Sequence, residues 1–375
     1  MGKRVLITGG AGFIGSHLAD LFLGNGYSVR VYDNLDPQVH GNDAKVPDYL
    51  SNEAEFIQGD VRDRDSFAKA LKGCDILVHF AAAVGVGQSM YEIMRYTSIN
   101  TMGAATVLEE AVNQRDHIER MLVASSMSIY GEGLYTCGRC GQVTPRLRPS
   151  EQLEKRNWEM LCPSCRGTCE PLPTPESKPL FPTSVYAVNK RDHEELFISI
   201  GEAYGIPTTA MRFFNVYGER QALSNPYTGV GAIFASRLLN GKPPVVFEDG
   251  GQSRDFIHVK DIARGCFLAL QSSRSAGQVY NLGTGRKLSI LEVGQAIARE
   301  LGRPEDDFIV RNEYRAGDIR HCYADVTRAR EELGFTAEKA FEDGVAELCS
   351  WVASQTAVDM VEKATEELKS RGLAR

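Results

Sequence analysis

A glycine-rich loop lies between an apolar run and a helical pattern near the start of the chain. Arg4-Val-Leu-Ile-Thr8 has the composition of a buried parallel strand, and Ser16-His-Leu-Ala-Asp-Leu-Phe-Leu23 has helical periodicity. Between them stands Gly9-Gly-Ala-Gly12-Phe-Ile-Gly15. Glycines at this spacing permit a tight turn and the close approach of a pyrophosphate, and a helix N-terminus attracts phosphate. The sequence therefore predicts a strand–loop–helix unit that binds a dinucleotide.

Three more apolar runs continue the alternation of strands and helices: Ala54–Asp60, Asp75–Phe80 and Arg120–Ser125. This alternation predicts an α/β fold with a doubly wound parallel sheet of the Rossmann type. Because ligands of such sheets bind at the carboxyl ends of the strands, we expect the functional side chains to gather at that edge.

An acidic residue ends the second predicted strand. Asp33 closes the run Ser28–Asp33, where a carboxylate accepts hydrogen bonds from ribose hydroxyls and repels a 2′-phosphate. This position favours NAD over NADP, although Asp33 could also form a simple turn with Asn34. Asp60 and Val61 stand where an adenine edge would be contacted. The small residues that follow the next strand would either admit a cofactor or pack closely, and they begin with Phe80, Ala81 and Ala82.

Tyr186 and Lys190 stand four residues apart, a spacing that places both on one face of a helix. An ammonium group beside a phenol favours the phenolate and lowers its pKa from about 10. Tyr186 is therefore a candidate general base, and Ser126, at the end of a predicted strand, is a candidate for orienting the substrate. By itself the spacing also fits an amphipathic pair on a solvated helix face.

Short motifs occur in order along nearly the whole chain: Thr8–Gly15, Asp33–Asn34, Gly59–Val61, His79–Ala82, Asn100, Ser125–Gly131, Tyr186–Lys190, Arg212–Gly218, Arg254–Val259 with Asp261, Asn281–Gly285, and Arg315–Asp318. Together they resemble the extended short-chain dehydrogenase/reductase family, in its branch of nucleotide-sugar epimerases and dehydratases. The resemblance implies a cofactor site made of Gly9, Gly12, Phe13, Ile14, Gly15, Asp33, Asn34, Asp60, Val61, Phe80, Ala81, Ala82, Asn100, Tyr186 and Lys190.

The resemblance also implies roles for single residues. Tyr186 would be the base, Lys190 its partner that also binds the nicotinamide ribose, and Ser126 the ligand of the reacting sugar oxygen. Arg254 and Arg315 would hold the substrate diphosphate, a task that forked guanidinium donors suit, although each could form a surface salt bridge instead. Asn215 and Asp318 complete the expected substrate site.

The segment after Ser126 distinguishes between members of this branch. The 4,6-dehydratases carry an Asp-Glu pair there, whereas this chain has Met127-Ser128. Epimerase-reductases of GDP-sugars place a Cys where this chain has Ser128. Cys322 resembles the residue that sets pocket size in UDP-galactose 4-epimerases. The stretch Arg220–Val230, together with a cysteine insert, most resembles the dTDP-L-rhamnose 4-epimerases.

The expected reaction is therefore epimerisation at C4 of a nucleotide-diphosphate sugar, such as dTDP-L-rhamnose or another dTDP-6-deoxyhexose. It would proceed through a transient 4-keto sugar, with tightly bound NAD that is recycled in each turnover. A nucleotide-sugar dehydratase or 4-reductase on the same fold is the first alternative. A nucleic-acid-binding relative with a zinc ribbon is the second.

Two Cys-x-x-Cys pairs interrupt the chain between Gly131 and Pro182. Cys137 and Cys140 form the first pair, and Cys162 and Cys165 form the second. This spacing is typical of a four-thiolate zinc site, and such a site is expected to be structural because four protein ligands leave no position for substrate. Reduced cysteines of a site that has lost its metal are the alternative. The insert begins and ends beside the expected active site. It could be a flap at the sugar pocket, a subunit contact or a decoration facing solvent.

Charge and composition limit the kinds of partner and the cellular location that we expect. The chain has 375 residues and a net charge of −7, which disfavours a nucleic-acid partner because nucleic acids are bound by basic surfaces. A strand begins directly after Met1, so we expect no signal peptide, and we find no long apolar run that would span a membrane. Nine cysteines without an export signal indicate reduced thiols in the cytoplasm.

We expect three parts in the chain. The NAD-binding domain would comprise residues 1–131 and 171–217, with 250–283 returning to it. The zinc-ribbon-like insert would comprise residues 132–170, and the α/β nucleotide-sugar lobe residues 218–249 and 284–375. The helices around Asn100 and Tyr186 resemble those through which the family dimerises, so a homodimer is expected.

Overall fold

The computed structural model describes residues 2–43, 45–223, 229–315, 317–355 and 361–374. Its largest element is a sheet of seven parallel strands in the order β14-β9-β5-β4-β1-β2-β3. These strands are β1 (Arg4–Thr8), β2 (Ser28–Asp33), β3 (Glu55–Gln58), β4 (Ile76–His79), β5 (Arg120–Ser126), β9 (Thr208–Phe213) and β14 (Gln278–Leu282). The strand order reverses between β1 and β4, which is where such sheets bind ligands.

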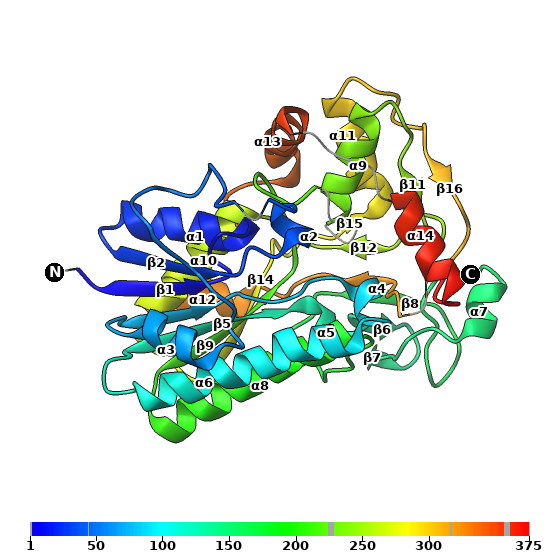
Figure 1. Cartoon of the computed structure of the whole chain (residues 1–375). Helices are drawn as coiled ribbons and strands as arrows, with labels where there is room; N and C mark the ends of the chain where they lie inside the picture. The colour runs from blue at the N-terminus through cyan, green and yellow to red at the C-terminus, as the bar shows by residue number, and fades with distance from the viewer. Residues whose placement is uncertain (1, 44, 224–228, 316, 356–360, 375) are drawn as a thin grey trace.

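Helices cover both faces of this sheet (Figure 1). One core holds Val5 and Ile7 of β1, and the other holds Leu6, because successive side chains of a strand point to opposite faces. The first face is covered by α1 (Phe13–Gly24), α10 (Val259–Gln271) and α12 (Thr327–Leu333). The second is covered by α3 (Arg64–Leu71), α6 (Gly103–Asn113) and α8 (Val185–Tyr204). The predicted doubly wound parallel sheet is confirmed.

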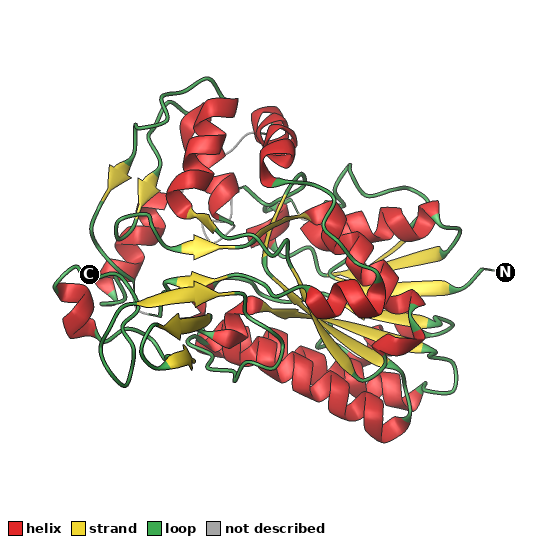
Figure 2. Ribbon diagram, turned by 180° about the vertical axis from the view of Figure 1, so that it is seen from behind, coloured by secondary structure: helices red, strands yellow, loops and turns green. Residues whose placement is uncertain are grey.

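A second lobe lies over the carboxyl-end side of the sheet (Figures 1 and 2). Its helices α9 (Val230–Leu239), α11 (Ile290–Glu300) and α13 (Phe341–Ser354) share one apolar core. Two small sheets belong to this lobe: β15 (Leu288–Ser289), β12 (Ser253–Arg254) and β17 (His321–Cys322) form one, and β11 (Val245–Val246) and β16 (Ile309–Val310) form the other. A capping box at Ser289 and Glu292 begins α11.

The segment with the two cysteine pairs forms an antiparallel sheet of its own. Its strands, in the order β7-β6-β8, are β6 (Leu134–Cys137), β7 (Gly141–Val143) and β8 (Cys169–Leu172). A short helix, α7 (Ser150–Glu154), follows β7. Leu134 pairs with Leu172, so the two ends of this insert lie side by side.

Short elements complete the fold. They are α2 (Pro37–His40), α4 (Val86–Ser89), α5 (Ile93–Thr97), the π-helical turn η1 (Ser98–Met102), the 3₁₀ turns η2 (Met127–Tyr130) and η3 (Ser273–Ser275), the paired strands β10 (Asn215–Tyr217) and β13 (Phe256–His258), and α14 (Val361–Ser370).

Late in the sequence, the division of residues between the second lobe and the sheet domain differs from the expected one. Helix α12 lies within the range expected for the sugar lobe, yet Ala329 and Leu333 pack in the core beneath the large sheet. The edge strand β14 requires this cover, because a parallel strand is normally buried on both faces. Strand β12, conversely, lies within 250–283 but pairs in the second lobe with β15 and β17.

Candidate active site

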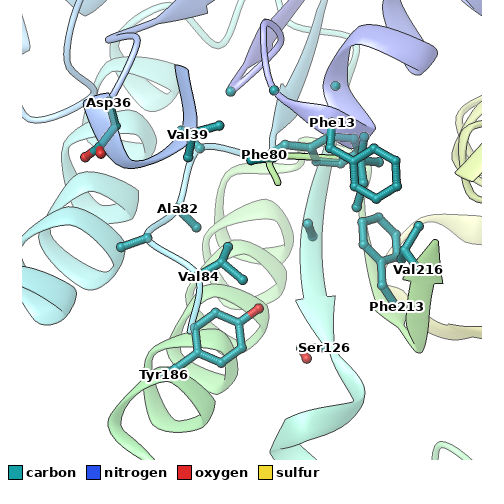
Figure 3. A pocket seen from close by; sticks show the side chains of 18 of the residues that line it. Phe13, Asp36, Val39, Phe80, Ala82, Val84, Ser126, Tyr186, Phe213 and Val216 are labelled. Atoms are coloured by element: carbon teal, nitrogen blue, oxygen red, sulfur yellow. The ribbon is translucent and has the colours of Figure 1, made fainter. Parts of the chain in front are cut away.

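A cavity of about 460 Å³ opens at the carboxyl ends of the parallel strands. Residues of the glycine loop line one end of it, and Ser126, Tyr186 and Lys190 line the other. Figure 3 shows the Tyr186 side chain reaching into this space from one wall and Phe13, Phe80 and Phe213 forming the opposite end. Apart from Asn100, the sequence-predicted cofactor and catalytic residues therefore surround one space.

The glycine loop is shaped by two close backbone approaches. Gly9 has φ +69°, and a Cβ there would lie 2.7 Å from the Ala81 nitrogen. A Cβ on Gly15 would lie 2.3 Å from the Gly9 carbonyl oxygen. Only glycine fits both positions, and the turn directs the N-terminus of α1, capped by Gly12, toward the cavity.

Asp33 lies at the end of β2 and lines the cavity. Its carboxylate accepts hydrogen bonds from the backbone N–H groups of Ala11 (3.1 Å) and Leu35 (2.9 Å). Burial raises the pKa of Asp33 above its ordinary value. Asp60 lines the same end, and its hydrogen bonds from Arg62 lower the pKa of its carboxyl.

Tyr186 and Lys190 lie in the first turns of α8, whose N-cap is Ser184. The Ser184 hydroxyl accepts from the Ala187 N–H (3.1 Å), and the Ser89 hydroxyl accepts from the Tyr186 N–H (3.0 Å). The first bond caps α8, and the second fixes its start against α4. Figure 3 shows the Tyr186 hydroxyl turned toward the side of the cavity where Ser126 lies.

The electrostatics of this pair differ from the expectation drawn from spacing. Burial raises the pKa of Tyr186. The hydrogen bond with Ser126 acts in the opposite direction but is the smaller effect, so the pKa is about 12. Burial lowers the pKa of Lys190 to about 7. The Lys190 ammonium donates to the Ala124 carbonyl oxygen (3.0 Å). In this structure Lys190 is therefore held by the strand, and its expected pull on the Tyr186 pKa is absent, because desolvation dominates both groups.

Ser126 ends β5 and begins the turn η2. Its hydroxyl accepts from the Ser128 N–H (3.1 Å) and lies 2.9 Å from the Ser128 hydroxyl. The neighbouring Met127 packs in an apolar cluster with Tyr130, Phe214 and Cys322. Among the described residues that line the cavity, the carboxylates are Asp33, Asp36 and Asp60, all at the glycine-loop end. No described carboxylate lines the cavity at Tyr186.

Asn100 supports the cavity from behind. It is fully buried in the π-helical turn η1. Its side-chain amide accepts from the Ala83 N–H (2.8 Å) and donates to the Ala83 carbonyl (3.1 Å). Asn100 thereby fixes the loop that contains Ala81 and Ala82, which do line the cavity. Asn100 itself is not among the lining residues.

The expected substrate residues occupy two places. Asn215 lines the cavity, and its side-chain oxygen is buried without a hydrogen-bond partner among the described residues. Arg254 lies outside the cavity wall and donates to the carbonyls of Ser253 (2.8 Å), Ile319 (2.8 Å) and Arg320 (3.0 Å). Arg315 pairs with Asp318 at 2.8 Å. Cys322, the expected size gate, lies behind Met127 rather than on the cavity wall. Of the stretch Arg220–Val230, residues 224–228 lie outside the described part.

Two histidine sites were not anticipated from the sequence. His193 Nδ1 lies 3.5 Å from the Lys190 ammonium, and His79 packs against His193 with ring centroids 5.2 Å apart. Burial lowers the pKa of both imidazoles, to about 3 for His79. His40 lines the cavity with its Nε2 3.8 Å from the Asp33 carboxylate. His193 follows Lys190 by three residues on the same helix, and that spacing is the signal that could have revealed it.

The four cysteines of the insert meet in space. The sulfurs of Cys137, Cys140, Cys162 and Cys165 all lie within 4.8 Å of one another, and Cys137 and Cys165 are 3.4 Å apart. Backbone N–H groups lower the pKa of Cys137 and bring that of Cys162 to about 6. Four sulfurs at this spacing fit the tetrahedral thiolate set that zinc prefers.

The chain is similar to known proteins over almost its full length. Residues 5–151 match the NAD dependent epimerase/dehydratase family, and residues 165–348 match the GDP-mannose 4,6 dehydratase family. A dTDP-L-rhamnose 4-epimerase of Burkholderia thailandensis is 34% identical over 94% of this chain and 96% of its own.

Solved structures agree with this likeness. The UDP-glucose 4-epimerase of Thermotoga maritima with UDP-glucose has a TM-score of 0.76 and 28% identity, covering 93% of this chain and 98% of its own. The UDP-glucose 4-epimerase of Thermus thermophilus in complex with NAD has a TM-score of 0.74 and 26% identity, covering 94% and 100%. None of the described helices is both long and apolar enough to cross a membrane.

Proposed function

The chain belongs to the NAD dependent epimerase/dehydratase family, and from this premise we propose that it is an isomerase that inverts C4 of a nucleoside-diphosphate sugar. The observation that carries the proposal is the cavity in which Tyr186, Ser126 and Lys190 stand at one end and the glycine loop and Asp33 at the other. Its relatives include 4-epimerases of dTDP- and UDP-sugars.

The residues present fit bound NAD. The α1 N-terminus offers its N–H groups to the pyrophosphate, and Asp33 offers carboxylate oxygens to the ribose hydroxyls. Asp33 and Asp36 together disfavour a 2′-phosphate, which supports NAD rather than NADP. NAD supplies a reversible hydride acceptor for C4. Because it would be regenerated in each turnover, tight binding suits the reaction.

The chain's own residues would move the proton. In its phenolate form Tyr186 would take the proton of the sugar 4-hydroxyl, and it would return one to the 4-keto oxygen after the sugar has turned in the cavity. Ser126 hydrogen-bonds that oxygen in both states. Lys190 lines the same wall and donates to the Ala124 carbonyl, and Asn215 offers to substrate an amide oxygen that has no hydrogen-bond partner among the described residues. Positioned acid–base groups of this kind contribute about a hundred- to ten-thousand-fold.

A dTDP-6-deoxyhexose such as dTDP-L-rhamnose is the substrate we favour, because the relative from Burkholderia thailandensis is a dTDP-L-rhamnose 4-epimerase. The match to the GDP-mannose 4,6 dehydratase family makes a dehydratase the alternative. Eliminating water needs an acid and a base near C5 and C6. Met127 and Ser128 occupy the expected positions, and no described carboxylate lines that end of the cavity.

A structural zinc in the four-cysteine site and a homodimer complete the proposal. The insert's sulfurs match a closed zinc site, which leaves no position for substrate. Met94 of α5, Met102 of η1 and Val188 of α8 are exposed by 87%, 58% and 44% on the helices expected at the subunit contact. We place the protein in the cytoplasm, where thiolate ligands stay reduced.

Incubation of the purified protein with a panel of nucleotide sugars, followed by NMR, tests this function. We expect dTDP-L-rhamnose to equilibrate with its C4 epimer without added NAD. Release of a keto sugar would indicate a dehydratase, and consumption of added NADH in proportion to product would indicate a reductase. If only UDP-glucose equilibrates with its C4 epimer, the proposed reaction stands and the proposed substrate is wrong.

A further inference from the structure

The insert and the second lobe are joined by a cluster of charged side chains that are buried except for the half-buried Glu159 and the exposed Asp249. Residues Glu132, Arg148 and Glu159 come from the insert and its base, and Glu248, Asp249, Arg320 and His321 come from the second lobe. Arg148 forms a two-pronged pair with Glu248, at 2.8 and 2.9 Å, and both side chains are buried. A paired guanidinium and carboxylate in this geometry hold a fixed orientation.

Arg320 makes the second connection in this cluster. Its guanidinium donates to Glu159 of the insert (3.1 Å), to Asp249 (2.7 Å) and to Glu248 (3.1 Å). His321 Nε2 lies 3.2 Å from the other oxygen of Glu159. Glu248 has φ +53°, a conformation that a residue with a side chain adopts only when its surroundings hold it. The hydrogen bonds from Arg148 and Arg320 keep Glu248 in this conformation.

The insert also forms hydrogen bonds with the backbone of β17. The Glu132 carboxylate accepts from the N–H groups of Arg320 (2.8 Å) and His321 (3.3 Å). The Gly133 N–H donates to the His321 carbonyl (2.9 Å), and a Cβ on Gly133 would lie 2.7 Å from that oxygen. Leu153 and Trp158 add an apolar contact to Tyr314. The insert is thus fixed to Tyr314 by an apolar contact and to Arg320 and His321 by hydrogen bonds.

The segment held by the insert lies next to the expected diphosphate ligands, Arg254 and Arg315. The carbonyls of Ile319 and Arg320 accept from Arg254, while the Arg320 N–H donates to Glu132. This short segment therefore lies between the insert on one side and Arg254 on the other. Arg148 also donates to the Asp318 carbonyl (3.4 Å), at the end of the turn where Arg315 pairs with Asp318.

The cysteine site lies directly behind these contacts. Glu132 accepts from the Tyr135 hydroxyl (2.7 Å), and Tyr135 packs in one cluster with Cys137, Cys162 and Cys169. Met160, which follows Glu159, is in the same cluster, and its carbonyl accepts from the Cys169 N–H (2.9 Å). The position of Glu132 and Glu159 therefore depends on the order of the cysteine site.

We propose that the insert is a brace for residues 318–321 of the second lobe, which hold the expected diphosphate ligand Arg254 in place, with Glu132, Arg148 and Glu159 as positioning residues. The proposal rests on the proposed function for the identity of the substrate, and on the contacts above for the brace itself. Metal at the four cysteines would then act on affinity for the nucleotide part of the substrate and leave the Tyr186 chemistry and the cofactor end unchanged.

Amide hydrogen exchange of the full-length protein tests the brace without reference to activity. After removal of metal with a chelator, exchange at Arg320 and His321 should accelerate, while Val5 to Ile7 of β1 should stay protected. Unchanged exchange at Arg320 and His321, or equal acceleration throughout the chain, would overturn the proposal. Glu132→Gln should accelerate exchange at the same two amides with metal still bound.

Binding of dTDP and UDP, measured by calorimetry, tests the consequence for substrate. Arg148→Lys keeps the charge without the fork, and Glu159→Gln changes a half-exposed acid, so both variants should fold. We expect each to weaken nucleoside-diphosphate binding by about tenfold and to raise KM similarly, since small misplacements of binding groups have effects of this order. Turnover number, bound NAD and metal content should stay within about twofold of the parent, as expected for lost uniform binding.

Arg299→Met is the matched control, because the exposed Arg299–Glu305 pair has similar geometry elsewhere in the second lobe. It should leave all of these values unchanged. Normal dTDP and UDP binding by the Arg148→Lys and Glu159→Gln variants, or a loss of turnover in step with binding, would overturn the brace. If the parent protein binds neither nucleotide, the proposed function fails instead, and hydrogen exchange alone decides the inference.

Discussion

The catalytic end of the cavity and the charge cluster of the insert both bury ionisable groups, but they bury them differently. Lys190 has a carbonyl and a neutral imidazole as its neighbours, and no described carboxylate lies with it at that end of the cavity. Arg148 and Arg320 are surrounded by carboxylates that accept their hydrogen bonds. A charge buried without a counterion has a shifted pKa and is suited to proton transfer, whereas a charge with full partners is suited to holding structure.

The largest expected effect is on turnover at the cavity. Tyr186→Phe should lower turnover by about a hundred- to ten-thousand-fold, because it removes the group that exchanges the proton. Bound NAD and the urea midpoint of unfolding should hardly change, since the ring is kept. Near-normal epimerisation by this variant would refute the role of Tyr186. A large loss of stability would mean that the catalytic end of the cavity, like the charge cluster of the insert, serves to hold the fold.

The next effect is on stability at the cluster. Arg148→Met should lower the free energy of unfolding by about 3 kcal/mol, because Glu248 loses its two-pronged partner and keeps only the bond from Arg320. Arg299→Met breaks an exposed pair and should change the same quantity by less than about 1 kcal/mol. Urea titration of both variants measures the difference. Equal effects would mean that the cluster is no more structural than a surface pair.

The smallest effect is a pH dependence that distinguishes Lys190 from the paired arginines. Its pKa is lowered from 10.5 to about 7 in the folded chain, so between these values the unfolded chain holds a proton that the folded chain lacks. Stability should therefore rise with pH in this window, by at most about 1.4 kcal/mol per pH unit from this group. Lys190→Met should remove that slope in urea titrations at pH 7 and 9. Parallel slopes for parent and variant would show that Lys190 is protonated in the fold.

The parts of the site that sequence could predict are those set by neighbours along the chain. The glycine loop, Asp33 at a strand end, and the pair Tyr186 and Lys190 follow from local spacing, and the structure brings them to one cavity. The four-cysteine cluster follows for the same reason, since each pair is a short motif.

Contacts between distant segments could not be predicted in this way. Glu132, Arg148, Glu248 and Arg320 each read as ordinary surface charges, because nothing in their local sequence indicates burial. Arg254 was expected to face a ligand, but three backbone carbonyls take up its donors here. Two of those carbonyls, of Ile319 and Arg320, belong to a segment more than sixty residues away, so only the folded chain shows them.

The pairing of Leu134 with Leu172 has a consequence for how the catalytic groups come together. Closing a flexible loop costs conformational entropy that grows with its length, by about 0.6 kcal/mol for each doubling. Once β6 and β8 pair, the chain between Ser126 and Tyr186 behaves as a short connection through Met127–Gly133 and Pro173–Val185. The insert's own three-stranded sheet thus shortens the loop that the host sheet has to close between Ser126 and Tyr186.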